Sequence, residues 1–115
     1  MKRNQFKTLR NKADKLLQIK YVILNSRCLT CGRPTYCMHH YIHKNQSSFL
    51  RYYPPNLIPV CVGCHCKIHQ SQDPETLNMI VKIKGQKWAD DLYEKRRTVC
   101  KMNVGYLRDI IKKLQ

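Results

Sequence analysis

The chain has 115 residues, with 22 Lys or Arg against 7 Asp or Glu, so its net charge is +15 and its pI is about 9.8. This length favours a single domain spanning residues 1–115, and this charge indicates a polyanionic partner. No apolar run approaches the roughly 18–20 residues of a membrane span, and no hydrophobic signal region follows the basic N-terminus, which argues against secretion.

Charge divides the chain into three parts of different composition. Residues 1–27 hold eight basic side chains and one acid, a net charge of +7, and residues 82–115 hold ten bases and four acids, a net charge of +6. Residues 28–81 carry only +2, but they contain all five histidines and six of the seven cysteines. Basic flanks therefore surround a nearly neutral segment that is rich in metal-binding side chains.

The first half of the chain predicts one helix and two strands. Residues 1–24 carry a broad apolar stripe without Gly or Pro, which is typical of a helix. Residues 35–42 are β-branched and aromatic enough to form a strand. Residues 43–55 are polar and end in Tyr-Tyr-Pro-Pro, which predicts a loop. Residues 56–60 form a second short strand, in which Pro59 limits the pairing.

The second half predicts helices. A helix is expected over 62–71, and Asp73-Pro74 supplies an N-cap residue followed by the preferred first helical residue. Two more helices follow over 86–98 and 104–114, the last one capped by Asn103. The expected fold class is small α+β. A basic N-terminal helix (1–27) and a C-terminal helical region (72–115) flank a core over 28–71.

Two Cys-x-x-Cys pairs, Cys28 with Cys31 and Cys61 with Cys64, indicate a structural zinc site. Each pair offers two sulfurs at the spacing of a tetrahedral edge, and structural Zn²⁺ takes four ligands. The alternative is buried free cysteines or disulfides. In the reducing cytoplasm, where we expect this protein, spaced cysteine pairs bind metal more often than they form disulfides.

The three remaining cysteines have other interpretations. Cys66 competes with Cys64 as the fourth zinc ligand. Cys37 and Cys100 are expected to be small apolar residues of the core.

Four histidines have spacings that favour a second metal site. His65 and His69 are four residues apart on the expected helix and so share one face. His39 and His40 lie at the far end of the first strand, where adjacent residues point to opposite faces. Either the strand ends or bulges there, or the metal reaches His39 around its edge. His43 is an alternative ligand, and otherwise a surface residue or a phosphate contact.

These residues together resemble a known family. The segment over 28–69 is similar to the HNH endonucleases of the ββα-metal superfamily through Cys28-Leu-Thr-Cys31, Met38-His39-His40-Tyr41, Asn56-Leu57-Ile58 and Cys61-Val-Gly-Cys64-His65-Cys-Lys-Ile-His69. The three letters of the motif are met by His40, by Asn56 and by His65 or His69. The resemblance implies a ββα-metal core in a metal-dependent DNA endonuclease that hydrolyses phosphodiester bonds and leaves 5′-phosphate and 3′-hydroxyl ends.

The same resemblance implies a role for each site residue. His40 would be the general base that takes a proton from water, a role that suits an imidazole with a pKa near ~6.5. Asn56 would pin the loop between the strands and help to orient His40. His39, His65 and His69 would hold the catalytic divalent ion. Imidazole ligands favour Mn²⁺, Ni²⁺ or Zn²⁺ over Mg²⁺, and the resemblance implies a divalent ion from this set of four.

A looser resemblance concerns the C-terminal region. Residues 80–115 are similar to the tail of phage NinG-type recombination nucleases, through Gly85-Gln-Lys-Trp88-Ala-Asp-Asp-Leu92 and Cys100-Lys-Met-Asn-Val-Gly-Tyr106-Leu. Those proteins have Gly before the base histidine and Asn after the last Cys, where this chain has His39 and His65. The preferred function is a phage recombination nuclease acting on branched DNA in a bacterial host. The alternatives are a restriction or homing nuclease, a non-catalytic zinc-stapled nucleic-acid-binding module, and a structural protein with a second zinc.

DNA is the expected partner, and no association with a membrane is expected. Symmetric cutting of a four-way junction would imply a homodimer. The residues expected to bind nucleic acid are Lys2, Arg3, Lys7, Arg10 and Arg51. Tyr52 and Tyr53 lie beside the site, where they either stack on bases or pack in the core. Trp88 and Tyr93 are expected between the C-terminal helices.

Overall fold

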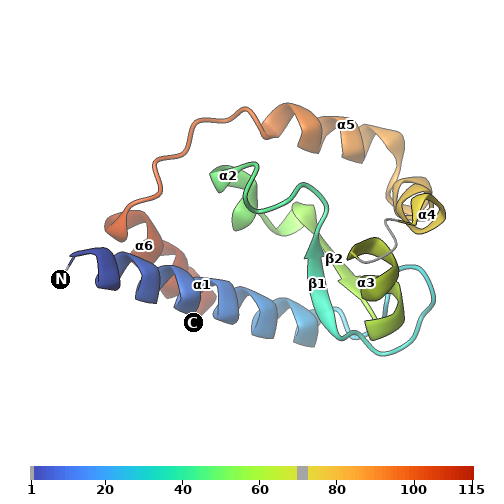
Figure 1. Cartoon of the computed structure of the whole chain (residues 1–115), viewed down its shortest axis with the longest axis horizontal. Coiled ribbons are helices and arrows are strands. Elements are labelled where there is room, and N and C mark those ends of the chain that lie inside the picture. The colour runs from blue at the N-terminus through green and yellow to red at the C-terminus, as the bar shows by residue number, and fades with distance from the viewer. Residues whose placement is uncertain (1, 70–72) are drawn as a thin grey trace.

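The computed structural model describes residues 2–69 and 73–115, and the side chains of Lys2 and Arg3 are outside this description. Figure 1 shows the arrangement of the elements along the chain. Their bounds are α1 Lys2–Leu24, β1 Cys37–His40, α2 Ser48–Arg51, a 3₁₀ turn Pro54–Asn56, β2 Leu57–Val60, α3 Val62–His69, α4 Pro74–Lys84, α5 Gln86–Lys95 and α6 Val104–Leu114. Among the described helices, none combines the length and the apolar character needed to cross a membrane.

The two strands form an antiparallel sheet with helices on both faces. One face packs Met38 and Leu57 against α1 and α6, which lie side by side. The other face packs Ile58 and Val60 against α3 and α4, through Ile68 and Ile80. The α+β class expected from the sequence is therefore observed.

Side chains and loops cover both outer edges of this small sheet. Beside β1, the Gln18 amide of α1 donates to the Met38 carbonyl oxygen at 2.9 Å and accepts from the Met38 N–H at 2.8 Å. Beside β2, the Leu29 N–H donates to the Pro59 carbonyl oxygen at 2.9 Å. Met38 and Pro59 face each other in the register. The backbone N–H and C=O of Met38 point away from β2, so Met38 and Pro59 form a pair without hydrogen bonds between them. Proline, which has no N–H, is therefore tolerated at this position.

The expected helix signals in the C-terminal half are confirmed. Asp73 caps α4 by accepting from the Glu75 N–H, and Pro74 is the first residue of that helix. Asn103 caps α6 by accepting from the Tyr106 N–H at 2.8 Å. Gly85 separates α4 from α5 at a φ of 101°, which favours glycine.

Several expected boundaries are wrong. The region 43–55 is not only a loop, because Ser47 caps the short helix α2 by accepting from the Leu50 N–H. The strands are shorter than 35–42 and 56–60, since a 3₁₀ turn precedes β2 and limits the residues available to pair with β1. The helix expected over 86–98 ends at Lys95, and the one expected over 62–71 is described to His69, with residues 70 and 71 outside the described part.

Candidate functional site

The four cysteines of the two Cys-x-x-Cys pairs gather in one place. The Cys28–Cys31 turn lies against β2, and Cys61 and Cys64 lie where β2 passes into α3. Their sulfur atoms all lie within 4.8 Å of one another. Gly32 has a φ of 75° and closes the first turn, where its N–H donates to the Cys28 carbonyl oxygen at 3.0 Å. The four thiols are thus placed to hold a metal ion.

Their electrostatics fit a cation. Burial raises the pKa of the Cys28 thiol, but hydrogen bonds from Thr30 and backbone N–H groups outweigh this effect and lower that pKa to about 6. Burial raises the pKa of Cys64 to about 12, and the neighbouring sulfurs add to this rise. Thiols crowded in this way cannot all ionise without a positive charge among them, and a divalent ion supplies that charge.

The other cysteines lie outside this cluster. Cys66 is exposed and is not among the four gathered sulfurs. Cys37 is half-buried and packs against Ile58 and its neighbours, in agreement with the expected role in the core. Cys100 is also only half-buried.

Three histidines form a second group of ligand atoms. The Nδ1 or Nε2 atoms of His39, His65 and His69 lie within 4.8 Å of one another. The ring centroids of His65 and His69 are 4.4 Å apart, and those of His39 and His69 are 5.0 Å apart. His43 is exposed, and its ring centroid is 6.1 Å from those of both His39 and His69. It borders the group without belonging to it.

The inner member of this group is kept neutral. His39 is 5% exposed, and burial together with the neighbouring histidines lowers the pKa of His39 to about 3. Burial also lowers the pKa of His65. Neutral imidazoles keep a lone pair that a metal ion can share. Three imidazole nitrogens around one metal ion leave further coordination positions open.

His40 lies on the opposite face of β1 from His39 but opens into the same cleft. The cleft has a volume of about 270 Å³ and is lined by Gln18, Cys37, Met38, His39, His40, His43, Lys44, His65 and His69. The strand ends at His40, so the cleft reaches both faces around the end and edge of β1. His39 and His40 can therefore line one cleft although they point to opposite faces of the strand.

A single hydrogen bond fixes the tautomer of His40. Its Nε2 is 2.9 Å from the Arg51 carbonyl oxygen. A carbonyl oxygen only accepts, so Nε2 carries the proton and the lone pair of a neutral ring is on Nδ1. Burial lowers the pKa of His40 although this hydrogen bond opposes the shift. Of the two ring nitrogens of His40, Nδ1 is therefore the one that can accept a proton.

Asn56 ties together the segment between the strands, as its expected pinning role requires. It is fully buried. Its side chain accepts from the Ile42 N–H at 2.8 Å and donates to the carbonyl oxygens of Ile42 at 2.9 Å and Leu50 at 3.2 Å. These bonds place the end of α2 next to β1, and the Arg51 carbonyl oxygen that holds His40 lies at this end.

Arg51 is not placed as a DNA contact, contrary to the expectation. It is 8% exposed, and its guanidinium donates twice to the Asp14 carboxylate, with Nε 3.0 Å from Oδ1. A guanidinium paired in this way inside the protein has no free face for a phosphate. Its backbone carbonyl contributes to the site instead, through His40.

The basic residues of α1 are placed unevenly. Lys7 is exposed, whereas Arg10 is half-buried and stacks over Phe6, with Cζ 5.6 Å from the ring centroid. The side chains of Lys2 and Arg3 are outside the described part. Lys44, which no sequence motif predicted, is an exposed cation that lines the histidine cleft. Its position next to the His-rich strand end was the only available signal.

The aromatic residues divide between core and surface. Tyr52 is buried against α1 and α6, so core packing is correct for this tyrosine. Tyr53 is half-buried and packs on Phe49 with ring centroids 5.2 Å apart. Trp88 is half-buried, and its Nε1 donates to the Pro55 carbonyl oxygen at 2.9 Å. Tyr93 is 54% exposed, so its expected place in the core is wrong.

Comparison of the chain with protein-family models, with curated proteins and with solved structures gives no significant match.

Proposed function

We propose that this protein is a metal-dependent DNA endonuclease of the HNH type. The observation that carries the proposal is the cleft lined both by three gathered imidazoles and by a fourth histidine, His40, whose Nε2 is held by a backbone carbonyl oxygen. The preferred assignment within this class is a phage recombination nuclease acting on branched DNA. The strand–strand–helix order β1, β2, α3, with a Cys₄ group beside it, supports a ββα-metal core.

His39, His65 and His69 would hold the catalytic ion, and the four cysteines would hold structural zinc. A divalent cation among the three imidazoles would stabilise negative charge on the phosphate and on the leaving 3′ oxygen. The imidazoles favour Mn²⁺, Ni²⁺ or Zn²⁺ as this ion.

The chain's own residues supply the rest of the reaction. His40 Nδ1 accepts a proton from the attacking water, while the Arg51 carbonyl oxygen holds the ring through Nε2. Asn56 acts as a positioning residue, because its hydrogen bonds fix the segment that carries this carbonyl. Lys44 lines the cleft and attracts the phosphate.

The test is a panel of labelled DNAs: duplex, single strand, flap and four-way junction, each with Mg²⁺, Mn²⁺ or Ni²⁺. We expect metal-dependent cleavage, fastest on branched DNA, with 5′-phosphate products. His69→Ala should abolish it, because it removes one of the three imidazoles, whereas Cys66→Ser, an exposed residue outside both ligand groups, should not. Tight binding of all four DNAs without cleavage under any metal would contradict the proposal and favour a non-catalytic zinc-stapled binding module.

A further inference from the structure

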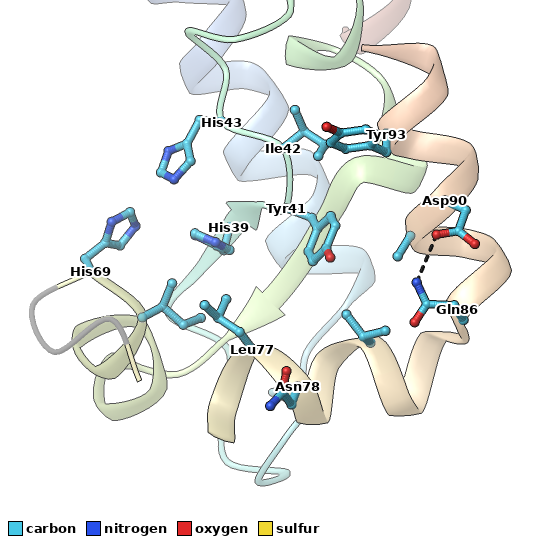
Figure 2. Close-up of a pocket in the computed structure, with 13 residues that line it drawn as sticks. His39, Tyr41, Ile42, His43, His69, Leu77, Asn78, Gln86, Asp90 and Tyr93 are labelled. Atoms are coloured by element: carbon cyan, nitrogen blue, oxygen red, sulfur yellow. Dashed lines mark hydrogen bonds between the residues drawn. The ribbon is translucent and has the colours of Figure 1, made fainter. Parts of the chain in front are cut away.

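A second cleft opens from the histidine group. It has a volume of about 670 Å³ and shares His39, His43 and His69 with the first cleft. Its other walls come from the residues after β1 and from α3, α4 and α5. In Figure 2 the three histidines stand at one end, while Gln86 and Asp90 stand at the other. A ligand bound at the histidine group could therefore extend into this second cleft.

The charge of this second cleft differs from that of the protein. Within residues 2–69 and 73–115, no lysine or arginine lines it, although the chain carries +15. Asp90 contributes a carboxylate to its wall. The first cleft, in contrast, is lined by Lys44. A phosphate is attracted to the first cleft and finds no countercharge in the second, so the second suits an uncharged group.

The lining of the second cleft suits a flat heterocycle. Two rings are held in its wall: Tyr41 packs on Trp88 with centroids 4.7 Å apart, and Arg96 stacks on Tyr93 from outside the lining, with Cζ 3.9 Å from the centroid. Gln86 Nε2 donates to Asp90 Oδ1 at 2.9 Å, which leaves the Gln86 carbonyl oxygen free to accept. The apolar and amide residues of the wall are Ile42, Ile68, Leu77, Val81, Ala89 and Asn78. Apolar walls, ring faces and a few hydrogen-bonding groups are what a nucleobase needs.

We propose that the second cleft binds one unpaired nucleobase of the DNA strand whose phosphodiester lies against the histidine group. This inference rests on the proposed nuclease function and narrows its substrate. A base enters such a cleft only after leaving the stack, which costs least where the nucleotide is already unpaired. The substrate is therefore DNA with an unpaired nucleotide next to the cut, as in single strands, flaps and junctions.

The experiment maps the base by removing it. The panel DNA that is cut fastest carries an abasic residue at each position in turn on both sides of the mapped cut, and binding is measured with the His40→Ala protein so that no cleavage occurs. We expect one position at which base removal weakens binding about tenfold, as loss of one stacked base does. At the other positions the change should stay within about twofold, because sequence-tolerant backbone contacts dominate there.

Variants then assign that base to the second cleft. In the same His40→Ala background, Tyr93→Ala should weaken binding of intact DNA by a similar factor and abolish the effect of the abasic residue, while Tyr93→Phe should retain it. Asn78→Ala should reduce the effect, and Met79→Ala, its exposed neighbour on α4 outside the lining, should not. Equal effects at all positions, or a positional effect that survives Tyr93→Ala, would overturn the base site. If the unmutated protein still cuts the panel DNAs, the nuclease proposal stands without it; absence of cleavage throughout the panel removes both.

Discussion

Cys31 and Cys66 are both exposed thiols, yet only Cys31 belongs to the gathered set of four sulfurs. The difference arises from the turn that Gly32 closes, which brings Cys31 to within 3.4 Å of Cys61 between their sulfur atoms. A metal ion bound there links the Cys28 turn to the start of α3. Such a link stabilises a small domain directly, because the site does not exist in the unfolded chain.

We expect Cys31→Ser to abolish zinc binding and to lower the free energy of unfolding by on the order of 3–5 kcal/mol. Cys66→Ser is the matched control and should leave about one zinc per chain with little change in stability. Native mass spectrometry and denaturant unfolding measure both quantities. Loss of zinc from Cys66→Ser would mean that Cys66 is a ligand in place of Cys64, and retention of zinc by Cys31→Ser would exclude Cys31 as a ligand.

The metal-ligand candidates could be predicted from the sequence because their spacings are local. The two residues of each Cys-x-x-Cys pair lie in one turn, and His65 and His69 lie one helical turn apart on the same face, so the sequence spacing alone brings each pair together. Arg51 could not be predicted in this way. Its partner Asp14 is 37 positions away on α1, and nothing in the sequence distinguishes a buried, paired arginine from a free one.

At the scale of elements, α1 does more than carry charge, because Gln18 joins it to the outer edge of β1. Both polar groups of Met38 are bonded to the Gln18 amide, as a third strand would bond them. This contact holds the strand that carries His39 and His40. It also covers an edge that would otherwise be open to pairing with another chain.

Gln18→Ala should lower the free energy of unfolding by about 1–3 kcal/mol, since it leaves two backbone groups of Met38 unpaired in a largely buried place. Gln5→Ala, on the exposed face of the same helix, should change it by less than about 0.5 kcal/mol. Urea unfolding of the two variants provides the comparison. Equal free energies of unfolding for the two variants would mean that the contact of Gln18 with β1 contributes nothing, because Gln→Ala does not lower helix propensity.

The short helix α2 shows where element prediction fails. Its four residues, Ser48–Arg51, are too few to show a helical period in the sequence, and a Ser47 cap and the fully buried Leu50 stabilise it instead. The strand boundaries could not be predicted from the sequence for a related reason. Their ends depend on the 3₁₀ turn before β2 and on the Asn56 hydrogen bonds, which are tertiary features.

Across the whole molecule, exposed basic side chains lie on helices that flank the sheet rather than in the histidine group itself. α1 and α6 lie together on one face of the sheet, and both bear exposed lysines, such as Lys7 and Lys112. A phosphate backbone bound along such a surface displaces counterions. Its affinity must then fall as salt is added.

We expect the dissociation constant for duplex DNA to rise by about 10³-fold between 50 and 200 mM salt if about six phosphates are contacted. Lys7→Ala should reduce the slope of log affinity against log salt by about 0.9, the value for one lost phosphate contact. Gln5→Ala on the same helix should leave the slope unchanged. A slope near zero for the unmutated protein would exclude the phosphate contacts.

In the proposed reaction, His40 acts as the base in the histidine cleft. The most direct measurement is single-turnover cleavage of the fastest panel DNA by His40→Ala, with DNA affinity and Mn²⁺ binding measured on the same protein. We predict a rate about 10²–10⁴-fold lower than that of the unmutated protein, as loss of a general base produces. DNA affinity should stay within a few-fold, and Mn²⁺ should still bind to the three remaining imidazoles. Cleavage by His40→Ala at the unmutated rate would contradict the account.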